Sequence, residues 1–212
     1  MLPKVVSLVK KIQEKKLTIT FDAEEAFRTD AYILFLTKLL KHQSLADFNG
    51  IGLVVQAYQT RSVQVVDYLI NLAKETKKTI PIRLVKGAYW DTEIKRAQDL
   101  GLESYPVFTV KEYTDLNYLA CAERMLKNND VIYPQFATHN AVTAATIIEI
   151  AGDKKFEFQK LYGMGDALHE ELSKHRSVRI YSPVGATHDL LAYLMRRLLE
   201  NGASANFISK VN

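Results

Sequence analysis

The chain of 212 residues has a single cysteine, Cys121, so it can form no disulfide within itself. Cys121 lies in "NYLACAERML", an amphipathic helical pattern, and we expect a buried structural thiol there rather than a nucleophile. No apolar run reaches the roughly 18 residues of a membrane-spanning helix, and no signal peptide opens the sequence. These absences favour a protein of the reducing cytoplasm.

Short signatures of catalysis and cofactor binding are also absent. The five histidines are scattered, none at metal-ligand spacing, so we expect no metal site. The sequence contains no G-x-S-x-G elbow, P-loop or G-x-G-x-x-G dinucleotide fingerprint. The formal charge of +4 is spread along the chain, and the densest basic run, residues 10–16, is typical of a solvated helix face. We therefore expect no nucleic acid to bind this segment.

What the sequence does contain is a regular alternation of two patterns. Short β-branched runs alternate with longer segments whose apolar residues recur at three- and four-residue steps, which predicts βαβ units and a parallel sheet in one domain, residues 1–212. The strand-like segments span residues 17–22, 52–58, 81–89, 105–110, 131–139, 156–163 and 178–185. We expect the six segments between Leu17 and Tyr162 to be consecutive parallel strands, and 178–185 to lead into the helix that carries Arg196 and Arg197 over the strand ends. The predicted helices span residues 2–16, 24–42, 62–76, 92–100, 115–127, 141–151, 166–174 and 188–201.

Polar or aromatic residues stand at the C-terminal end of nearly every predicted strand. They are Asp22, Gln56, Arg83, Lys86, Thr109, Thr138, His139, Tyr162 and Tyr181. One such residue could be a helix cap or a satisfied turn residue, but a whole row is better explained by a ligand site, which parallel β/α folds carry at this edge. Seven strand-like segments fall short of a full eightfold barrel, which takes about 250 residues, so the pattern favours a barrel that lacks its beginning over an open sheet.

Cationic and aromatic side chains near the strand ends indicate which kind of ligand this site would bind. Arg196 and Arg197 lie in the apolar stretch "LLAYLMRRLLENG", where guanidinium groups require an anionic partner, most simply a carboxylate. Arg83 and Lys86 make the same demand at a strand end. Flat rings near strand ends are supplied by Tyr58, Tyr89, Trp90, Tyr162 and Tyr181. Together they favour a planar anionic cofactor and a small anionic substrate.

Several motifs, in order along the chain, resemble the proline dehydrogenase family. They are "DAEEA", "GLVVQAYQ", "IRLVKGAYWD", "YPVFTVKEYTDLNYLACAERML", "IYPQFATHNA", "FEFQKLYGMG" and "RIYSPVG" with "LLAYLMRRLLENGASANF". The resemblance is strongest to bacterial bifunctional proline utilization proteins, in which an aldehyde dehydrogenase domain follows this one. It implies an α/β fold, a (β/α)8 TIM-type barrel truncated to about strands 3–8, so that the chain is the C-terminal part of the barrel.

The resemblance also implies a function. Members of the family bind FAD without a covalent bond and oxidise L-proline to Δ1-pyrroline-5-carboxylate by hydride transfer to flavin N5. Their electrons pass to a quinone, in the first step of proline catabolism to glutamate. For the parent protein this implies a cytoplasmic location, peripheral association with the inner membrane and a fused aldehyde dehydrogenase domain.

The family's functional residues can be carried onto positions of this sequence. The implied catalytic residues are Asp22, beside the substrate, and Arg83, which hydrogen-bonds flavin N5. Besides Arg83, the implied FAD contacts are Ala23, Gln56, Lys86, Gly87, Ala88, Trp90, Thr138 and His139. The implied proline pocket consists of Leu84, Tyr89, Tyr181, Arg196 and Arg197, the two adjacent arginines clamping the carboxylate.

The sequence departs from the family pattern in two places. The family's first two barrel strands have no counterpart, and "PVGATHDLL" stands where the family commonly has "PVGTHETLL". Two interpretations therefore stay open, a flavoenzyme and a non-catalytic folded fragment that lacks the cofactor. We expect the 212-residue chain alone to bind FAD weakly or not at all.

Overall fold

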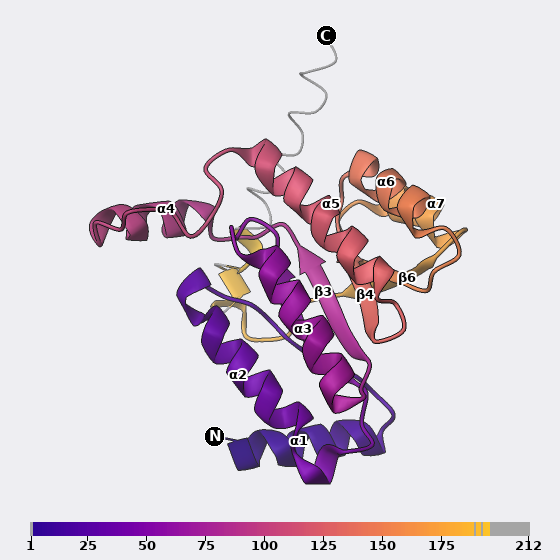
Figure 1. The fold of residues 1–212 in the computed structure, drawn as a ribbon. Coiled ribbons are helices and arrows are strands. Elements are labelled where there is room, and N and C mark those ends of the chain that lie inside the picture. Colours follow the sequence, from indigo (N-terminus) through magenta and orange to yellow (C-terminus); the bar gives the residue numbers. More distant parts are fainter. Residues whose placement is uncertain (1, 189, 192, 196–212) are drawn as a thin grey trace.

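The computed structural model describes residues 2–188, 190–191 and 193–195. Six parallel strands lie in chain order in one curled sheet (Figure 1). They are β1 (Ile19–Phe21), β2 (Ile51–Gln56), β3 (Ile80–Val85), β4 (Ile132–Ala137), β5 (Glu157–Leu161) and β6 (Ser177–Tyr181). Parallel strands in strict sequential order, with helices in the crossovers, are the arrangement of a β/α barrel.

Helices cover the convex face of this sheet and one of its ends. They are α1 (Leu2–Glu14), α2 (Thr29–Leu40), α3 (Ser62–Thr76), α4 (Trp90–Asp99), α5 (Lys111–Lys127), α6 (Ala141–Ala151) and α7 (Asp166–Ser173), with 3-10 turns η1 (Ala26–Arg28) and η2 (Gln43–Leu45). In Figure 1, α2, α3 and α5 cover the sheet, and α1 crosses the end from which β3 starts. The opposite end, toward which β3 points, is where the βα loops lie.

Side-chain alternation gives the two faces of the sheet different chemistry. Residues at alternate positions of a strand point to opposite faces. The helix-facing set is apolar and fully or almost fully buried, and includes Leu53, Val55, Ile82, Leu84, Phe136 and Phe158. The concave face carries the opposite set, in which Val54, Arg83, Gln135 and Glu157 are register partners from β2 to β5. The core therefore lies between sheet and helices, and the polar groups face the interior of the curl.

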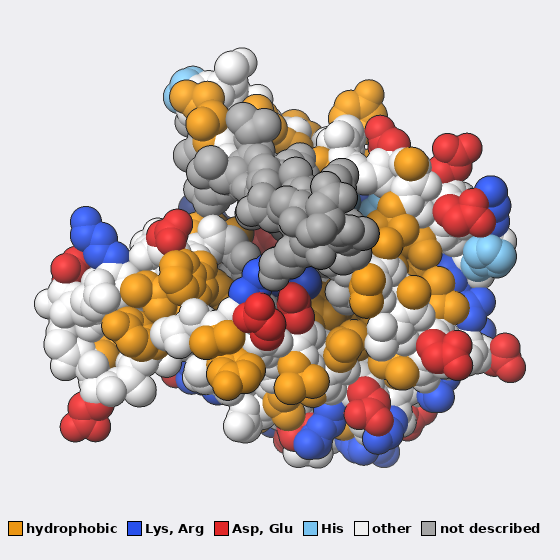
Figure 2. Space-filling model, turned by 90° about the horizontal axis from the view of Figure 1, so that it is seen from above, with side chains coloured by type: hydrophobic (Ala, Val, Ile, Leu, Met, Phe, Trp, Pro, Cys, Tyr) orange, Lys and Arg blue, Asp and Glu red, His pale blue; other side chains and the backbone are white. Residues whose placement is uncertain are grey.

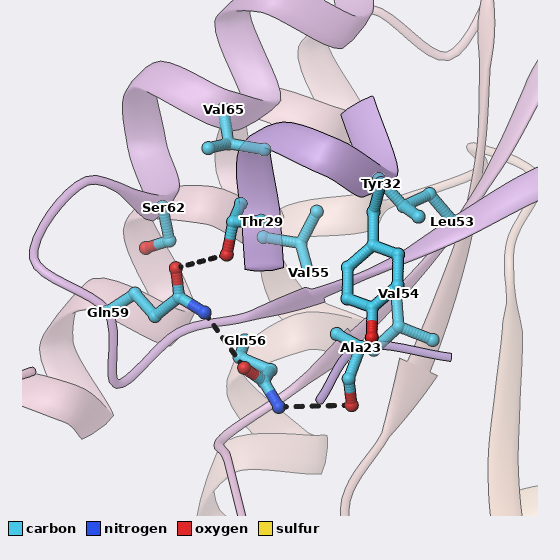
Figure 3. A pocket seen from close by; sticks show the side chains of 10 residues that line it. All are labelled: Ala23, Thr29, Tyr32, Leu53, Val54, Val55, Gln56, Gln59, Ser62 and Val65. Atoms are coloured by element: carbon cyan, nitrogen blue, oxygen red, sulfur yellow. Dashed lines mark hydrogen bonds between the residues drawn. The ribbon is translucent and has the colours of Figure 1, made fainter. Parts of the chain in front are cut away.

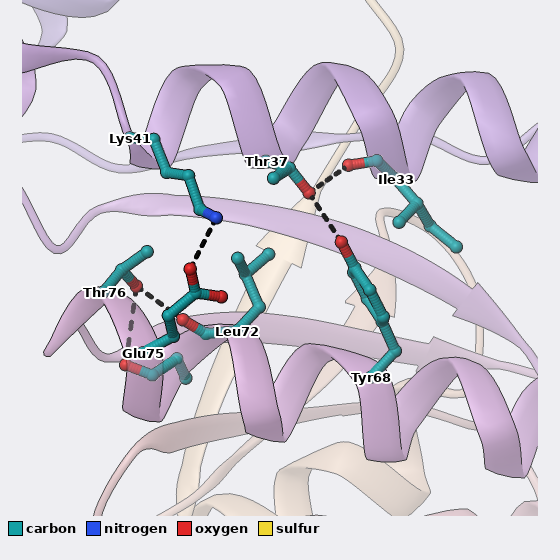
Figure 4. A network of polar contacts seen from close by, with 8 residues as sticks. Ile33, Thr37, Lys41, Tyr68, Leu72, Glu75 and Thr76 are labelled. Carbon is teal, nitrogen blue, oxygen red and sulfur yellow. Dashed lines mark hydrogen bonds and ion pairs between the residues drawn. The ribbon is translucent and has the colours of Figure 1, made fainter.

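Neighbouring helices are also joined by polar contacts at the surface. Between α2 and α3, Lys41 Nζ donates to Glu75 Oε1 at 2.6 Å, and the hydroxyls of Thr37 and Tyr68 lie 3.2 Å apart (Figure 4). The Thr37 hydroxyl also donates to the Ile33 carbonyl at 2.8 Å. Exposed pairs of this kind contribute little to stability, about 0–1 kcal/mol each, so helix packing depends mainly on the apolar core.

Most of the predicted elements are confirmed, and two strand predictions need correction. The predictions for residues 62–76 and 141–151 match α3 and α6. Residues 105–110 form no strand of the sheet, because their backbone instead bonds the β2–α3 loop, with Phe108 N–H donating to Tyr58 O at 2.8 Å. Residues 177–181 form β6, so the sixth strand comes after Tyr162 and not before it. Most of the predicted helix 188–201 lies outside the described residues.

The single cysteine is buried as predicted. Cys121 lies on α5 with no exposed surface, and its sulfur is 3.5 Å from the Ser62 hydroxyl of α3. Burial raises the pKa of the Cys121 thiol to about 11. A thiol in this state is protonated near neutral pH and is a poor nucleophile.

Leu84→Ala tests the division between the two faces of the sheet. Leu84 is 0% exposed within the core, so the substitution should lower the free energy of unfolding by about 2–5 kcal/mol. Leu116→Ala on α5 is the matched control, because Leu116 is 67% exposed and should cost less than about 0.5 kcal/mol. Urea denaturation measures both. Equal losses would mean that Leu84 does not pack in the core.

Candidate active site

Arg83 is the centre of the polar face and contacts both outer strands of the sheet. Its guanidinium Nη2 forms an ion pair with the Asp22 carboxylate, which directly follows β1. Its Cζ also lies 5.4 Å from the ring centroid of Tyr181, at the end of β6. Three residues singled out from the sequence, Asp22, Arg83 and Tyr181, are therefore brought together by the curl of the sheet. The Arg83 side chain is only 16% exposed, so its charge acts in a partly desolvated setting.

Beside this centre, an amide chain connects β2 with the segment after β1. Gln56 Nε2 donates to the Ala23 carbonyl at 3.4 Å, and Gln59 Nε2 donates to Gln56 Oε1 at 2.8 Å (Figure 3). The Thr29 hydroxyl donates to Gln59 Oε1 at 3.1 Å. Gln56 and Gln59 are each 4% exposed. Gln56 and Ala23, both predicted cofactor contacts, thus lie next to each other, whereas Gln59 and Thr29 were missed.

The turn after β3 depends on a glycine. Gly87 has φ +137°, a conformation that L side chains rarely adopt, and a Cβ built on it would lie 2.5 Å from the Tyr58 ring. Tyr58 N–H bonds the Lys86 carbonyl at 2.7 Å, which holds the turn against the β2–α3 loop. The Lys86 side chain forms an ion pair with Asp115 of α5. In this arrangement the Lys86 charge is directed to α5.

The aromatic residues that follow this turn are tied to neighbouring loops. The Tyr89 hydroxyl donates to Glu24 Oε2 at 2.9 Å, beside the Asp22–Ala23 segment. Trp90 Nε1 donates to the Phe108 carbonyl at 2.8 Å, and its side chain is 43% exposed. Ala88, directly before Tyr89, is half-buried. The turn therefore presents one aromatic side chain toward the Asp22 segment and one toward the α4–α5 connection.

Two histidines meet where β4 ends. Thr138 is buried and its hydroxyl accepts from Asn140 N–H at 3.2 Å. The ring of His139 packs edge-on against that of His169 from α7, with centroids 5.3 Å apart. His169 Nδ1 lies 2.9 Å from the Gly165 carbonyl, so Nδ1 carries the proton there. His169 is 2% exposed and was not singled out from the sequence.

A buried carboxylate on β5 is the largest feature that sequence reasoning missed. Glu157, 2% exposed, accepts from Arg179 Nε at 2.7 Å, from Arg179 Nη2 at 2.9 Å and from Gln159 Nε2 at 2.7 Å. Gln135 Nε2 and the Tyr133 hydroxyl donate to it as well, at 3.0 and 3.1 Å. Burial raises its pKa, but the hydrogen bonds from Arg179 and Gln159 outweigh this and lower the pKa below its ordinary value. The signal was polar residues at alternate positions of "YPQFA" and "EFQKL".

Two predictions for the substrate pocket have different outcomes. Leu84 does not face the site, because Arg83 before it points to the concave face and alternation turns Leu84 into the helix-packed core, where it is fully buried. Its predicted role as a pocket wall is wrong. Arg196 and Arg197 lie outside the described residues, and their role stays a prediction.

The surface at this end of the molecule has a mixed character. Figure 2 looks down on the end toward which β3 points, and shows Lys and Arg side chains directly beside Asp and Glu near the middle of the face. Hydrophobic side chains lie around this charged group. Within the described ranges, no cluster of three His, Cys, Asp or Glu side chains is placed to hold a metal ion. None of the described helices is long and apolar enough to cross a membrane.

Comparison with known proteins identifies this arrangement. The family model described as proline dehydrogenase matches residues 2–210. The chain belongs to the proline dehydrogenase family. It is 50% identical to Bifunctional protein PutA of Escherichia coli (strain K12) over 220 residues, which cover 99% of this chain and 17% of that protein. It is 29% identical to Proline dehydrogenase 1 of Bacillus subtilis (strain 168), over 82% of this chain and 53% of that protein.

Solved structures agree with the sequence comparison. A mutant of Proline Utilization A (PutA) from Bradyrhizobium japonicum superimposes with a TM-score of 0.92 at 51% identity, covering 97% of this chain and 22% of that one. PutA from Bdellovibrio bacteriovorus gives a TM-score of 0.90 at 33% identity. The predicted partial barrel of the proline dehydrogenase type is thereby confirmed. The chain spans about a fifth of the length of these PutA relatives, 17% of the E. coli protein and 22% of the B. japonicum chain.

Gly87→Ala tests the turn after β3. The new methyl group would be strained by φ +137° and would collide with the Tyr58 ring, so we expect a loss of about 2 kcal/mol or more in unfolding free energy. Gly101→Ala is the matched control, since Gly101 has φ +60° with nothing within 4 Å of a Cβ, and should cost only about 1 kcal/mol. Chemical denaturation compares them. A smaller loss for Gly87→Ala would contradict the steric argument.

Glu157→Gln should change how stability depends on pH. The folded-state pKa of Glu157 is depressed, so its contribution is present above the unfolded pKa of about 4.3 and is lost as pH falls through the folded pKa. At pH 7 we expect the variant to be less stable by about 1 kcal/mol or more. The difference should shrink as the pH falls below about 4.

The control for this prediction is Glu149→Gln on α6, where the side chain is exposed. It should leave stability at pH 7 within about 0.5 kcal/mol of the unmodified chain. Thermal unfolding at several pH values measures all three proteins. A difference between Glu157→Gln and the unmodified chain that does not change with pH would contradict the assignment of the ionised carboxylate.

Proposed function

We propose that this chain forms the flavin-binding and proline-binding part of an enzyme that oxidises L-proline to Δ1-pyrroline-5-carboxylate, with FAD held non-covalently. Membership of the proline dehydrogenase family supports the reaction. The position of the active site is inferred from the contacts of Arg83. Asp22 after β1 and Tyr181 of β6 both contact its guanidinium at the C-terminal end of the sheet. In β/α barrels this end is where catalysis takes place.

The donor set at this end fits a flavin. Arg83 keeps its positive charge at all relevant pH values, and Gln56 presents an amide N–H group on the same face of the sheet. Both are donors, and the polar edge of a flavin consists largely of nitrogen and oxygen acceptors. When bound, FAD supplies the hydride acceptor. A fixed cation there favours the negative charge that develops on reduction, and Asp22 holds that cation in place.

The remaining residues divide between cofactor and substrate. Besides Arg83, we assign cofactor contacts to Ala23, Gln56, Lys86, Gly87, Ala88, Trp90, Thr138 and His139. Tyr89 and Tyr181 would form walls of the proline pocket, because Tyr89 bonds the segment after Asp22 and Tyr181 packs on Arg83. Arg196 and Arg197 would bind the proline carboxylate, which orients the ring carbon for oxidation.

The wider setting is part of the same proposal. We infer a cytoplasmic protein that works at the inner membrane surface, where electrons from proline pass to a quinone. An aldehyde dehydrogenase activity in the same polypeptide would act on the product, in keeping with the relatives named bifunctional. The reaction would then be the first step in the conversion of proline to glutamate.

Two arginine substitutions should separate cofactor binding from substrate binding in the native protein. Arg83→Met should lower both flavin content and turnover, because the donor to the flavin is lost. Arg196→Met or Arg197→Met should raise the Michaelis constant for proline at least about tenfold, equivalent to about 1.4 kcal/mol, with flavin content nearly unchanged. Visible absorbance and proline-dependent dye reduction measure the two effects.

The opposite pattern would contradict these assignments. If Arg196→Met strips the flavin and leaves proline affinity intact, the pair belongs to the cofactor site. A native protein without flavin absorbance would favour the alternative, a folded fragment that lacks cofactor.

A further inference from the structure

The amide chain behind Gln56 has a fixed direction. The Ala23 carbonyl can only accept a hydrogen bond, so the Gln56 group that faces it at 3.4 Å must be the amide NH2 group, Nε2. Gln56 Oε1 then faces Gln59, which must offer its own Nε2, at 2.8 Å. Gln59 Oε1 is left for the Thr29 hydroxyl, at 3.1 Å. One backbone carbonyl therefore sets the orientation of both amides, and the relay Thr29–Gln59–Gln56 has one consistent polarity (Figure 3).

The relay is held rigidly by three separate elements. Thr29 is the first residue of α2, Gln56 ends β2, and Gln59 lies in the turn between β2 and α3. Backbone hydrogen bonds fix that turn on both sides of Gln59, which donates to Gln56 O at 3.2 Å and accepts from Ser62 N–H at 3.1 Å. Because Gln56 and Gln59 are almost fully buried, water has little access to replace a broken contact.

We propose that Gln59 and Thr29 are positioning residues that hold the Gln56 amide with its N–H side toward the flavin. The proposal rests on the function inferred above, in which Gln56 contacts FAD. Gln56 Nε2 has two hydrogens, and within the described part of the chain only one has a partner, the Ala23 carbonyl. Strand alternation places Gln56 on the same concave face as Val54 and Arg83, so in this proposal the other hydrogen is the one that a flavin acceptor atom would receive. If the amide turned over, the same place would present an oxygen and would repel that acceptor.

Gln59→Glu is the decisive variant, because it keeps the shape of the side chain and changes its donor. In this variant an ionised carboxylate can accept from Thr29 but cannot donate to Gln56 Oε1. It would instead attract the NH2 group of Gln56, so that the Gln56 amide turns over. A protonated carboxyl can still donate to Gln56 and would preserve the native direction. We therefore expect FAD binding to be close to normal at low pH, and at least about tenfold weaker once the carboxylate ionises.

The measurement is the FAD dissociation constant of the native protein, from flavin fluorescence quenching between pH 4.5 and 8.5. This range spans the ionisation of the new carboxyl, because burial at position 59 should raise its pKa above the ordinary value of about 4.3. Gln64→Glu on α3, an exposed glutamine, adds the same charge nearby and should leave the constant unchanged at every pH. In a Gln56→Leu background, Gln59→Glu should lose its effect, because there is no amide to turn. Thr29→Val, which replaces the hydroxyl by a methyl group of similar size, should weaken FAD binding about threefold, by the same factor at every pH.

The outcomes separate this proposal from the function on which it rests. Failure of the unmodified protein to bind FAD would overturn both. If the unmodified protein binds FAD, the relay alone is overturned by a Gln59→Glu variant with normal affinity at all pH values, or by one equally impaired with and without Gln56. A pH-dependent loss that requires Gln56 supports it. Should Gln59→Glu fail to fold, normal FAD affinity in Thr29→Val would overturn the relay.

Discussion

The contact of one arginine with both outer strands is the constraint on which the site depends. Arg83 lies on β3, yet its guanidinium meets Asp22 after β1 and the ring of Tyr181 on β6. In a flat sheet β1 and β6 would be separated by the width of the four strands between them. The curl brings the ends of both strands to one side chain. The geometry of the candidate site therefore depends directly on the curvature of the sheet.

Strand periodicity allows one sheet to serve packing and chemistry together. On β3, Ile82 and Leu84 enter the helix-packed core, and Arg83 between them points to the concave face. A polar interior is costly unless its groups are paired, and the pairing is dense where burial is greatest. Glu157 receives its five donor contacts from side chains on β4, β5 and β6. The concave face is thus organised as a network of hydrogen bonds and ion pairs, and stability comes mainly from the other face.

The sequence carried the order of elements and the position of the site, but not the pairing within it. Arg83, Gln56 and Asp22 could be found because polar groups at strand ends of a parallel fold point to one edge. Residues 105–110 were misread because β-branched content alone cannot show that a segment bonds a loop instead of a strand. Leu84 was misassigned by resemblance, although alternation from Arg83 already placed it in the core. Gln59 and Glu157 depend on contacts between distant segments, which no local pattern encodes.

The buried amides show why pairing matters as much as position. Gln135 and Gln159 both turn their amines to the Glu157 carboxylate, which can only accept, so their oxygens must point elsewhere. Gln56 likewise turns its Nε2 to a group that can only accept, the Ala23 carbonyl, while its oxygen accepts from Gln59. In each case a partner that can only accept a hydrogen bond determines which end of the amide faces it. These partners therefore determine whether an amide on the concave face would offer a ligand its nitrogen or its oxygen. The partners need not touch the ligand themselves.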